Sequence, residues 1–192
     1  MQVSKRKAEI LTVSAKMFRE RGFNAVSMRD IAAELDMKAA SLYNHISSKQ
    51  EILELIIIEI AEEFTDGMKE ISSSDLKLTE KLKAIIDLHV DLTLRDPDEM
   101  ACVNNDWMHL AEARQKYFLQ MRHEYELHFT QLLEAGMAEG EIRIMDTDVA
   151  MFAFLSTLRT LHLRYGKRRK VKAELLKHNL YEVLVNGLAT HH

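Results

Sequence analysis

The sequence contains little of what builds disulfide scaffolds, zinc centres or irregular chains. Its 192 residues include one cysteine, one proline and six glycines. A single cysteine excludes an internal disulfide and a cluster of thiolates for zinc, so we expect Cys102 to be a buried, inert thiol. The scarcity of proline and glycine, together with apolar residues that recur at spacings of three and four, predicts an all-α protein.

Long apolar runs are also absent. No stretch approaches the roughly 18 apolar residues that a membrane span needs. The first residues alternate polar and apolar at helical spacing, where a signal peptide would be continuously apolar. Because 47% of the residues are hydrophobic and 29% are charged, the composition is that of a soluble globular protein. We therefore expect a cytoplasmic protein that does not enter the membrane.

Charge is distributed unevenly along the chain. The net charge of −4 alone argues against a nucleic-acid partner, but residues 1–50 carry nine Lys/Arg against five Asp/Glu, a net charge of +4. Residues 51–192 carry seventeen Lys/Arg against twenty-five Asp/Glu, a net charge of −8. A basic head on an acidic body can bind a polyanion with one face only. Chance clustering of charges is the alternative explanation.

Helix start and stop signals divide the chain into about nine helices. Gly22 suits a left-handed end to the first helix, and Asp36 suits the turn between the second and third. Ser48 with Glu51 resembles a capping box for a long fourth helix. The predicted helices run from Ser4 to Arg21, Ser27 to Leu35, Lys38 to His45, Ser48 past Phe64, Leu76 to Leu94, Asp96 through Trp107, Arg114 to Ala135, Asp146 to Leu163 and Ala173 to Leu188.

Two domains are expected, a helix-turn-helix DNA-binding domain over residues 1–48 and a larger helical regulatory and dimerisation domain over residues 49–192. Two short helices joined by a tight turn, behind a supporting helix, are typical of a helix-turn-helix whose second short helix enters the major groove. The apolar side chains that would form its small core are Phe18, Phe23, Ile31, Ala32, Leu35, Leu42 and Ile46.

Outward positions of the second short helix are small, basic or hydrogen-bonding, which suits contacts with phosphates and base edges. The start of the preceding helix offers backbone N–H groups to a phosphate. Packing of the small core is the alternative role for Tyr43 and His45. The predicted DNA-binding residues are Ser27, Met28, Arg29, Lys38, Ala39, Ala40, Tyr43, Asn44, His45 and Lys49.

The stretch AKMFRERGFNAVSMRDIAAELDMKAASLYNHISSKQEIL, residues 15–53, resembles the DNA-binding domain of the TetR (tetracycline-repressor-like) family in its order of aromatic, glycine, cap and LY-x-H residues. The resemblance implies that Tyr43 and Lys49 hold phosphates. It also implies a homodimer formed through the last two helices. The dimer would hold the two copies of the helix from Lys38 to His45, called the reader helices, about 34 Å apart. Repression of transcription, relieved by a small-molecule effector, is the implied function.

Four residues depart from the family's pattern. Asp36 stands where glycine is usual, at a position that needs a left-handed backbone, and Lys38 replaces a Ser or Thr cap. Ala40 replaces a common glycine, and Asn44 stands where an aromatic residue is common. The operator sequence therefore cannot be carried over from relatives.

An effector pocket is expected among the helices from Leu76 to Leu163. An arginine in a helix as apolar as that around Arg159 needs a buried partner, a ligand anion or a route to solvent. The arrangement of Trp107, Tyr125 and Phe129 resembles the branch of the family that senses acyl-coenzyme A thioesters. For each apolar liner, ordinary core packing is the alternative. The predicted ligand-binding residues are His89, Trp107, Met108, Met121, Tyr125, Phe129, Phe152, Leu155, Arg159 and His162.

Two other classes of protein compete with this interpretation. One is a factor of the same fold that organises DNA or binds a protein without sensing a ligand. The other, more remote, is a helical metalloenzyme, but the paired Glu-x-x-His motifs of a di-iron bundle are absent from the sequence. No nucleophile elbow or phosphate loop is found either. We therefore expect no enzymatic activity, no metal and no cofactor.

Overall fold

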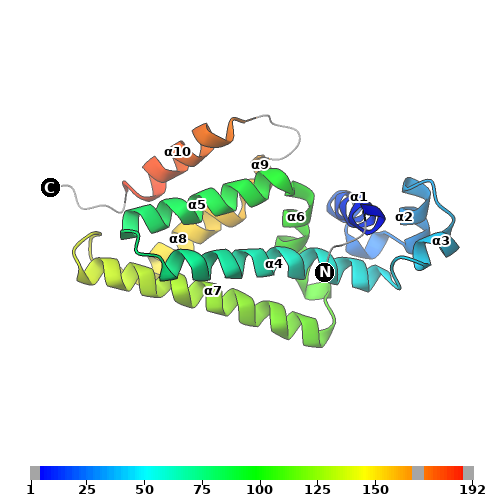
Figure 1. The fold of residues 1–192 in the computed structure, drawn as a ribbon, viewed down its shortest axis with the longest axis horizontal. Helices are drawn as coiled ribbons and strands as arrows, with labels where there is room; N and C mark the ends of the chain where they lie inside the picture. The colour runs from blue at the N-terminus through cyan, green and yellow to red at the C-terminus, as the bar shows by residue number, and fades with distance from the viewer. Residues whose placement is uncertain (1–4, 166–170, 188–192) are drawn as a thin grey trace. The chain divides into compact units, whose positions relative to one another are not determined.

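A computed structural model describes residues 5–165 and 171–187, and over these residues the chain is helical, as predicted (Figure 1). The described part contains ten α-helices and two short 3-10 helices. The chain divides into two compact units. Unit 1 consists of residues 1–61 and 98–119, and unit 2 of residues 62–97 and 120–192.

Unit 1 contains the predicted helix-turn-helix and a second, later part of the chain. Its helices follow the predicted order, although α3 is shorter than the predicted helix from Lys38 to His45. They are α1 (Lys5–Arg21), η1 (Phe23–Ala25), α2 (Met28–Glu34), α3 (Ala39–Tyr43), the first half of α4 (Lys49–Ser73), α6 (Pro97–Asn105), η2 (Trp107–His109) and the start of α7 (Glu112–Ala138).

Local sequence explains the short turns of unit 1. Gly22 ends α1 with a φ of 82°, and Asp36 has a φ of 52°, so both adopt the left-handed backbone that their positions were predicted to need. The side chain of Ser27 caps α2 and accepts a hydrogen bond from the Asp30 N–H at 3.2 Å. Pro97 stands at the first position of α6, where its missing N–H removes no helical hydrogen bond.

The predicted core of the helix-turn-helix is confirmed. All seven of its apolar side chains are buried, and Phe18 meets the ring of Phe23 edge-on at a centroid distance of 5.2 Å. Cys102 is fully buried as predicted, and its thiol donates to the carbonyl oxygen of Ala15 at 3.9 Å. Burial in apolar surroundings raises the pKa of this thiol, which keeps it protonated.

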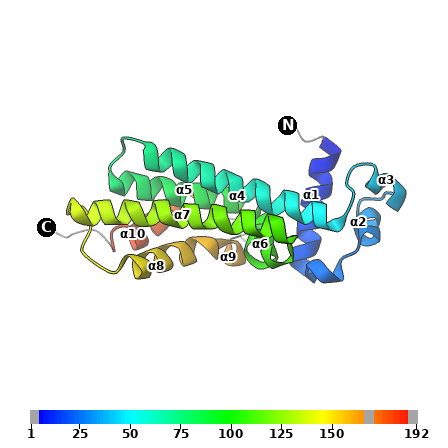
Figure 2. The ribbon, with the colours of Figure 1, turned by 90° about the horizontal axis from the view of Figure 1, so that it is seen from below.

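Unit 2 is a bundle in which α5 (Leu78–Arg95) contacts both α8 (Thr147–Arg159) and α10 (Ala173–Leu184) (Figures 1 and 2). The second halves of α4 and α7 belong to the same unit and are joined by an ion pair between Lys69 and Glu124 at 3.6 Å. Asp146 caps α8 by accepting from the Val149 N–H at 3.0 Å.

The helix predicted from Asp146 to Leu163 is interrupted. α8 ends at Arg159, and the four residues Leu161–Arg164 form a separate short helix, α9. The backbone N–H of Thr160 donates to the Ser156 carbonyl oxygen at 3.3 Å and its hydroxyl donates to the same oxygen at 2.8 Å, and the regular helix ends at this residue. The predicted ends at Ser4 and Leu188 lie outside the described residues.

Candidate nucleic-acid interface and effector site

The exposed face of α3 carries the residues predicted to read DNA. Behind it, Leu42 and Ile46 are at most 1% exposed and fix the helix on the core of unit 1. On the outside, Tyr43 is 53% exposed, and Lys38, Ala40, Asn44 and His45 are also exposed, whereas Ala39 is half-buried. Lys38 takes the cap position of α3 without a capping hydrogen bond, so its ammonium group is not used by the helix.

At the start of α2, the polar groups of Ser27 form hydrogen bonds with the first turn of the helix. The Ser27 N–H donates to the Asp30 carboxylate at 2.8 Å, which completes a capping box. Hydrogen bonds from the Ser27 side chain and backbone hold the pKa of the Asp30 carboxyl below its ordinary value. The Ser27 N–H, which was expected to face a phosphate, therefore already donates to an ionised carboxylate. Arg29, two residues further along, is exposed.

Lys49, which the resemblance implied to hold a phosphate, has partners within the protein. Its ammonium donates to the carbonyl oxygens of Phe23 at 2.7 Å and Val26 at 2.8 Å, and it lies 4.3 Å from the centroid of the Phe23 ring. Burial lowers the pKa of Lys49. Two of its three N–H groups are thus used to hold η1 against the start of α4.

Of the predicted effector residues, Trp107 and Met108 lie in unit 1, and the other eight lie in unit 2. The Trp107 ring stacks on Phe118 at a centroid distance of 5.9 Å, and Met108 is 57% exposed. Neither contributes to the core of unit 2. The sequence could not separate them from the other eight, because spacing along a chain does not show which compact unit a helix joins.

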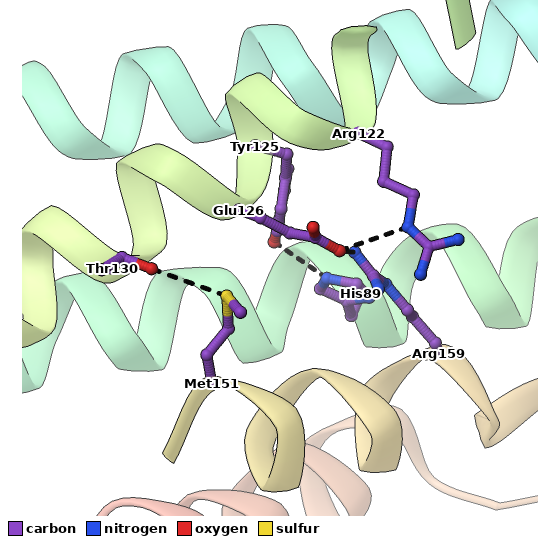
Figure 3. A network of polar contacts seen from close by, with 7 residues as sticks. All are labelled: His89, Arg122, Tyr125, Glu126, Thr130, Met151 and Arg159. Carbon is purple, nitrogen blue, oxygen red and sulfur yellow. Dashed lines mark hydrogen bonds and ion pairs between the residues drawn. The ribbon is translucent and has the colours of Figure 1, made fainter. Parts of the chain in front are cut away.

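A polar cluster inside unit 2 contains three of the predicted residues, His89, Tyr125 and Arg159 (Figure 3). The Nε2 of His89 on α5 and the phenol oxygen of Tyr125 on α7 form a hydrogen bond of 2.9 Å (Figure 3). Both residues are at most 5% exposed. The Phe64 ring of α4 packs on His89 at a centroid distance of 4.5 Å. Phe64 was not predicted as a site residue, although its position on the apolar face of the fourth helix was visible in the sequence.

Arg159 has found a protein partner. Its guanidinium donates to Glu126 on α7 at 2.8 Å, and Arg122 donates to the same carboxylate oxygen at 3.2 Å (Figure 3). Although burial opposes ionisation of Glu126, hydrogen bonds and charge from the two arginines hold its pKa below the ordinary value. Arg159 was predicted to need a partner, but nothing in the sequence distinguishes Glu126 from the other acidic residues of the chain.

The remaining predicted liners divide between core and surface. Met121, Phe129, Leu155 and His162 are at most 5% exposed, and the Nδ1 of His162 pairs with the Arg159 carbonyl oxygen at 2.9 Å. Phe129 meets Phe154 at a centroid distance of 5.0 Å. Phe152, in contrast, is 72% exposed, because the turn of α8 that carries it points away from the core of unit 2. Phe152 was predicted to line a buried pocket, but it lies on the surface of the single chain.

The burial of His89 has a measurable consequence for stability. Burial, and then the nearby charge of Arg159, lowers the pKa of His89 from 6.5 to about 3. Below pH 6.5 the unfolded chain takes up a proton that the folded chain refuses, so the free energy of unfolding falls as the pH falls. We expect His89 to contribute a loss of roughly 2–3 kcal/mol between pH 6.5 and pH 4.5.

This pH dependence is measured by urea unfolding at half-unit steps from pH 7.5 to pH 4.5. The His89→Phe variant should lose that part of the slope, whereas His123→Phe, on the exposed face of α7, should keep the wild-type profile. Parallel profiles for the wild type and His89→Phe would contradict the assignment of a neutral, buried imidazole.

Comparison with known proteins shows the family. Residues 10–56 match the sequence model described as bacterial regulatory proteins, tetR family, and residues 75–188 match that of the tetracyclin repressor-like C-terminal domain. The chain therefore belongs to the TetR family and is a DNA-binding transcription regulator. None of the helices in residues 5–165 and 171–187 is long and apolar enough to cross a membrane.

Individual relatives agree with this assignment. The HTH-type transcriptional repressor KstR2 of Rhodococcus jostii (strain RHA1) is 28% identical over 98% of this chain and 94% of its own. The structure of the ketosteroid transcriptional regulator KstR2 of Mycobacterium tuberculosis matches with a TM-score of 0.92 at 22% identity, over 99% of this chain and 98% of the other. AibR in complex with isovaleryl coenzyme A and operator DNA matches with a TM-score of 0.78 at 21% identity, over 94% and 98%.

Proposed function

We propose that this protein is a homodimeric repressor that places α3 in the major groove of its operator and leaves the DNA when unit 2 binds a small organic effector. The observation that carries the proposal is the exposed, hydrogen-bonding face of α3 held over the buried Leu42 and Ile46. A short helix anchored on one side and solvated on the other can enter a groove without unfolding its own core.

The contacts with DNA are divided by chemistry. Lys38 and Tyr43 bind phosphates, and Asn44 and His45 reach base edges or the backbone. Ala39 and Ala40 allow close approach and offer methyl groups to thymine. Met28 and Arg29 contact the backbone from the start of α2. Ser27 and Lys49 act indirectly, because the structure uses their polar groups to hold α2 and η1.

Dimerisation is supported by apolar side chains on the last helices of unit 2. A helix that carries apolar residues on every side, as the first turns of α8 do, is normally covered all round, yet one face of α8 is exposed in the single chain. α9 and α10 expose similar residues. Large exposed apolar side chains gathered on the last helices are typical of an interaction surface. The exposed members are Val149, Phe152, Leu163, Leu175 and Val183, each at least 53% exposed.

The effector is proposed to bind in unit 2 around His89, Tyr125 and Arg159, with Met121, Phe129, Leu155 and His162 as surrounding core. A protein that binds no effector would be more stable with only apolar side chains at this position. The core of unit 2 instead holds a polar cluster whose burial costs free energy. An acyl-coenzyme A thioester is one candidate, and it is supported by the similarity to AibR, whose structure contains isovaleryl coenzyme A. Effector binding shifts the population toward a conformation that fits the operator less well.

The proposal is tested by binding to the DNA upstream of the protein's own gene, measured by fluorescence anisotropy between 50 and 200 mM salt. We expect affinity to fall steeply with salt, because each neutralised phosphate releases condensed counterions. Lys38→Met should reduce the slope of log K against log salt by about 2, because the homodimer loses one phosphate contact in each half-site. The matched control is Lys116→Met, on the exposed face of α7, which should leave the slope unchanged.

A slope near zero would show that phosphate contacts do not hold the complex. Equal affinity for the upstream DNA and for a shuffled duplex of the same length would contradict sequence-specific recognition. Either result would reject the repressor assignment for this site, whatever unit 2 binds.

A further inference from the structure

Three side-chain polar atoms on α5 are buried without a hydrogen bond, and one of them, the Oδ1 of Asp87, belongs to a carboxylate whose other oxygen accepts from Lys83. The other two, the Nδ1 of His89 and the hydroxyl of Thr93, have almost no accessible surface and find no partner among the described residues. The residues are 3% and 1% exposed, respectively. Positions four apart on a helix lie on the same face, so both atoms belong to one side of α5. Buried polar groups are nearly always paired in folded proteins, and an unpaired couple therefore requires an explanation.

The hydrogen bond to Tyr125 determines which atom of His89 carries a proton. Burial keeps the imidazole neutral, so only one of its two nitrogens is protonated. If Nε2 were the donor, the Tyr125 hydroxyl proton would be buried with no acceptor, because the phenol has no other hydrogen bond in the described part of the chain. The phenol is therefore the donor, Nε2 accepts, and the proton is on Nδ1.

One face of α5 thus carries two protons that find no acceptor among the residues that the structure describes, one on the Nδ1 of His89 and one on the Thr93 hydroxyl, and the Thr93 oxygen does not accept from His89. A carbonyl oxygen has two lone pairs and no proton, and so it can accept from two donors on one face of a helix. A ligand hydroxyl would bring a further proton that itself needs an acceptor, and an ammonium group could accept from neither. An anionic group is not required at this point, because Glu126 already balances the charge of Arg159.

We propose that the effector of this protein presents a carbonyl oxygen to the Nδ1–H of His89 and the hydroxyl of Thr93. This inference rests on the proposed function, since it names the chemical group recognised at the effector site. Tyr125 is then a positioning residue, because its phenol fixes the imidazole tautomer without touching the ligand. In the free protein the two buried donors lack an acceptor within residues 5–165 and 171–187, which is unfavourable, and the carbonyl oxygen of a ketone, ester or thioester would accept from both.

The tautomer is measured first, on full-length protein labelled with ¹⁵N-histidine, by long-range ¹H–¹⁵N correlation at pH 7. The His89 signals are assigned by their loss in His89→Phe. We expect the Nδ1–H form in the wild type. A Tyr125→Phe variant, which removes the phenol donor, should shift the population toward the Nε2–H form. Observation of the Nε2–H form in the wild type would overturn the inference.

Recognition of the carbonyl is measured with two probes of nearly the same shape, cyclohexanone and methylenecyclohexane, which differ in whether an oxygen or a CH₂ group is doubly bonded to the ring. Titration is followed on the His89 imidazole signals and on the carbonyl stretch of bound cyclohexanone. We expect the wild type to bind the ketone at least about tenfold more tightly than the alkene. The carbonyl stretch should move to lower frequency on binding.

Matched variants separate recognition from general binding. Thr93→Val keeps the shape and removes one donor, so the preference for the ketone should fall to about threefold or less. Thr157→Val is the control, because the Thr157 hydroxyl already donates to the Ala153 carbonyl oxygen on its own helix. Equal binding of the two probes by the wild type, or no change at His89 up to the solubility of cyclohexanone, would overturn the inference.

Operator binding by the same samples distinguishes failure of the carbonyl site from failure of the proposed repressor function. Retained, salt-dependent binding of DNA without a preference for the ketone would reject the carbonyl site alone. Loss of any preference for the upstream DNA would reject the repressor function, even if the ketone bound as expected.

Discussion

The Phe152→Glu variant is expected to be a folded monomer with at least about a hundredfold lower affinity for the operator. Phe152 is 72% exposed on α8, so a carboxylate there costs the single chain little. In the proposed dimer the same residue is covered by a partner, and an unpaired charge in an apolar interface is strongly unfavourable. Two reader helices must be paired to hold successive major grooves, and a monomer loses one of them.

Sedimentation velocity gives the mass of the variant, circular dichroism its helical content, and anisotropy its affinity for DNA. The matched control is Leu127→Glu, on α7, where the native side chain is 47% exposed and lies outside the last helices. This control should remain dimeric and bind DNA normally. If Phe152→Glu stayed dimeric, the surface formed by α8, α9 and α10 would not be the interface.

The Phe129→Ala variant should lower the free energy of unfolding by about 3–5 kcal/mol. Phe129 is fully buried and packs against Phe154 in the core of unit 2, where truncation leaves a cavity that its neighbours cannot fill completely. Leu127→Ala, two residues earlier and exposed, should change the same quantity by less than about 0.5 kcal/mol. Urea unfolding followed by circular dichroism provides both values.

This result also separates two roles for Phe129. A residue that lines a ligand cavity contributes less to the stability of the free protein, because one side of it already lacks packing partners. A loss below about 1.5 kcal/mol would therefore place Phe129 at a cavity wall and return it to the set of direct ligand contacts.

Sequence alone predicted the helices of unit 1 closely, because their ends depend on local chemistry. Ser27 caps α2, Gly22 and Asp36 adopt left-handed backbones, and Pro97 starts α6, each as its residue type requires. The break at Thr160 was missed because a threonine inside an apolar helical pattern gives no strong stop signal. Thr157 makes the same side-chain bond to its own helix without ending it, so residue type alone does not locate the break.

Contacts between distant residues were the part that the sequence could not supply. Arg159 was known to need a partner, but Glu126 became that partner only when α7 and α8 packed together. Lys49 was expected to bind phosphate because of its place in a family motif, yet the carbonyl oxygens of Phe23 and Val26 lie within its reach. Periodicity placed His89 on an apolar face, and it could not show that Tyr125 would hold one of its nitrogens and leave the other unpaired.

The burial of Cys102 has a practical consequence for experiments on this protein. Because the only thiol of the chain is fully buried and remains protonated, maleimide and disulfide reagents reach it only when unit 1 opens. A cysteine introduced at the exposed Ala40 can therefore carry a fluorophore or spin label without removal of the native one. The rate at which Cys102 itself reacts then measures the rate of local unfolding in unit 1.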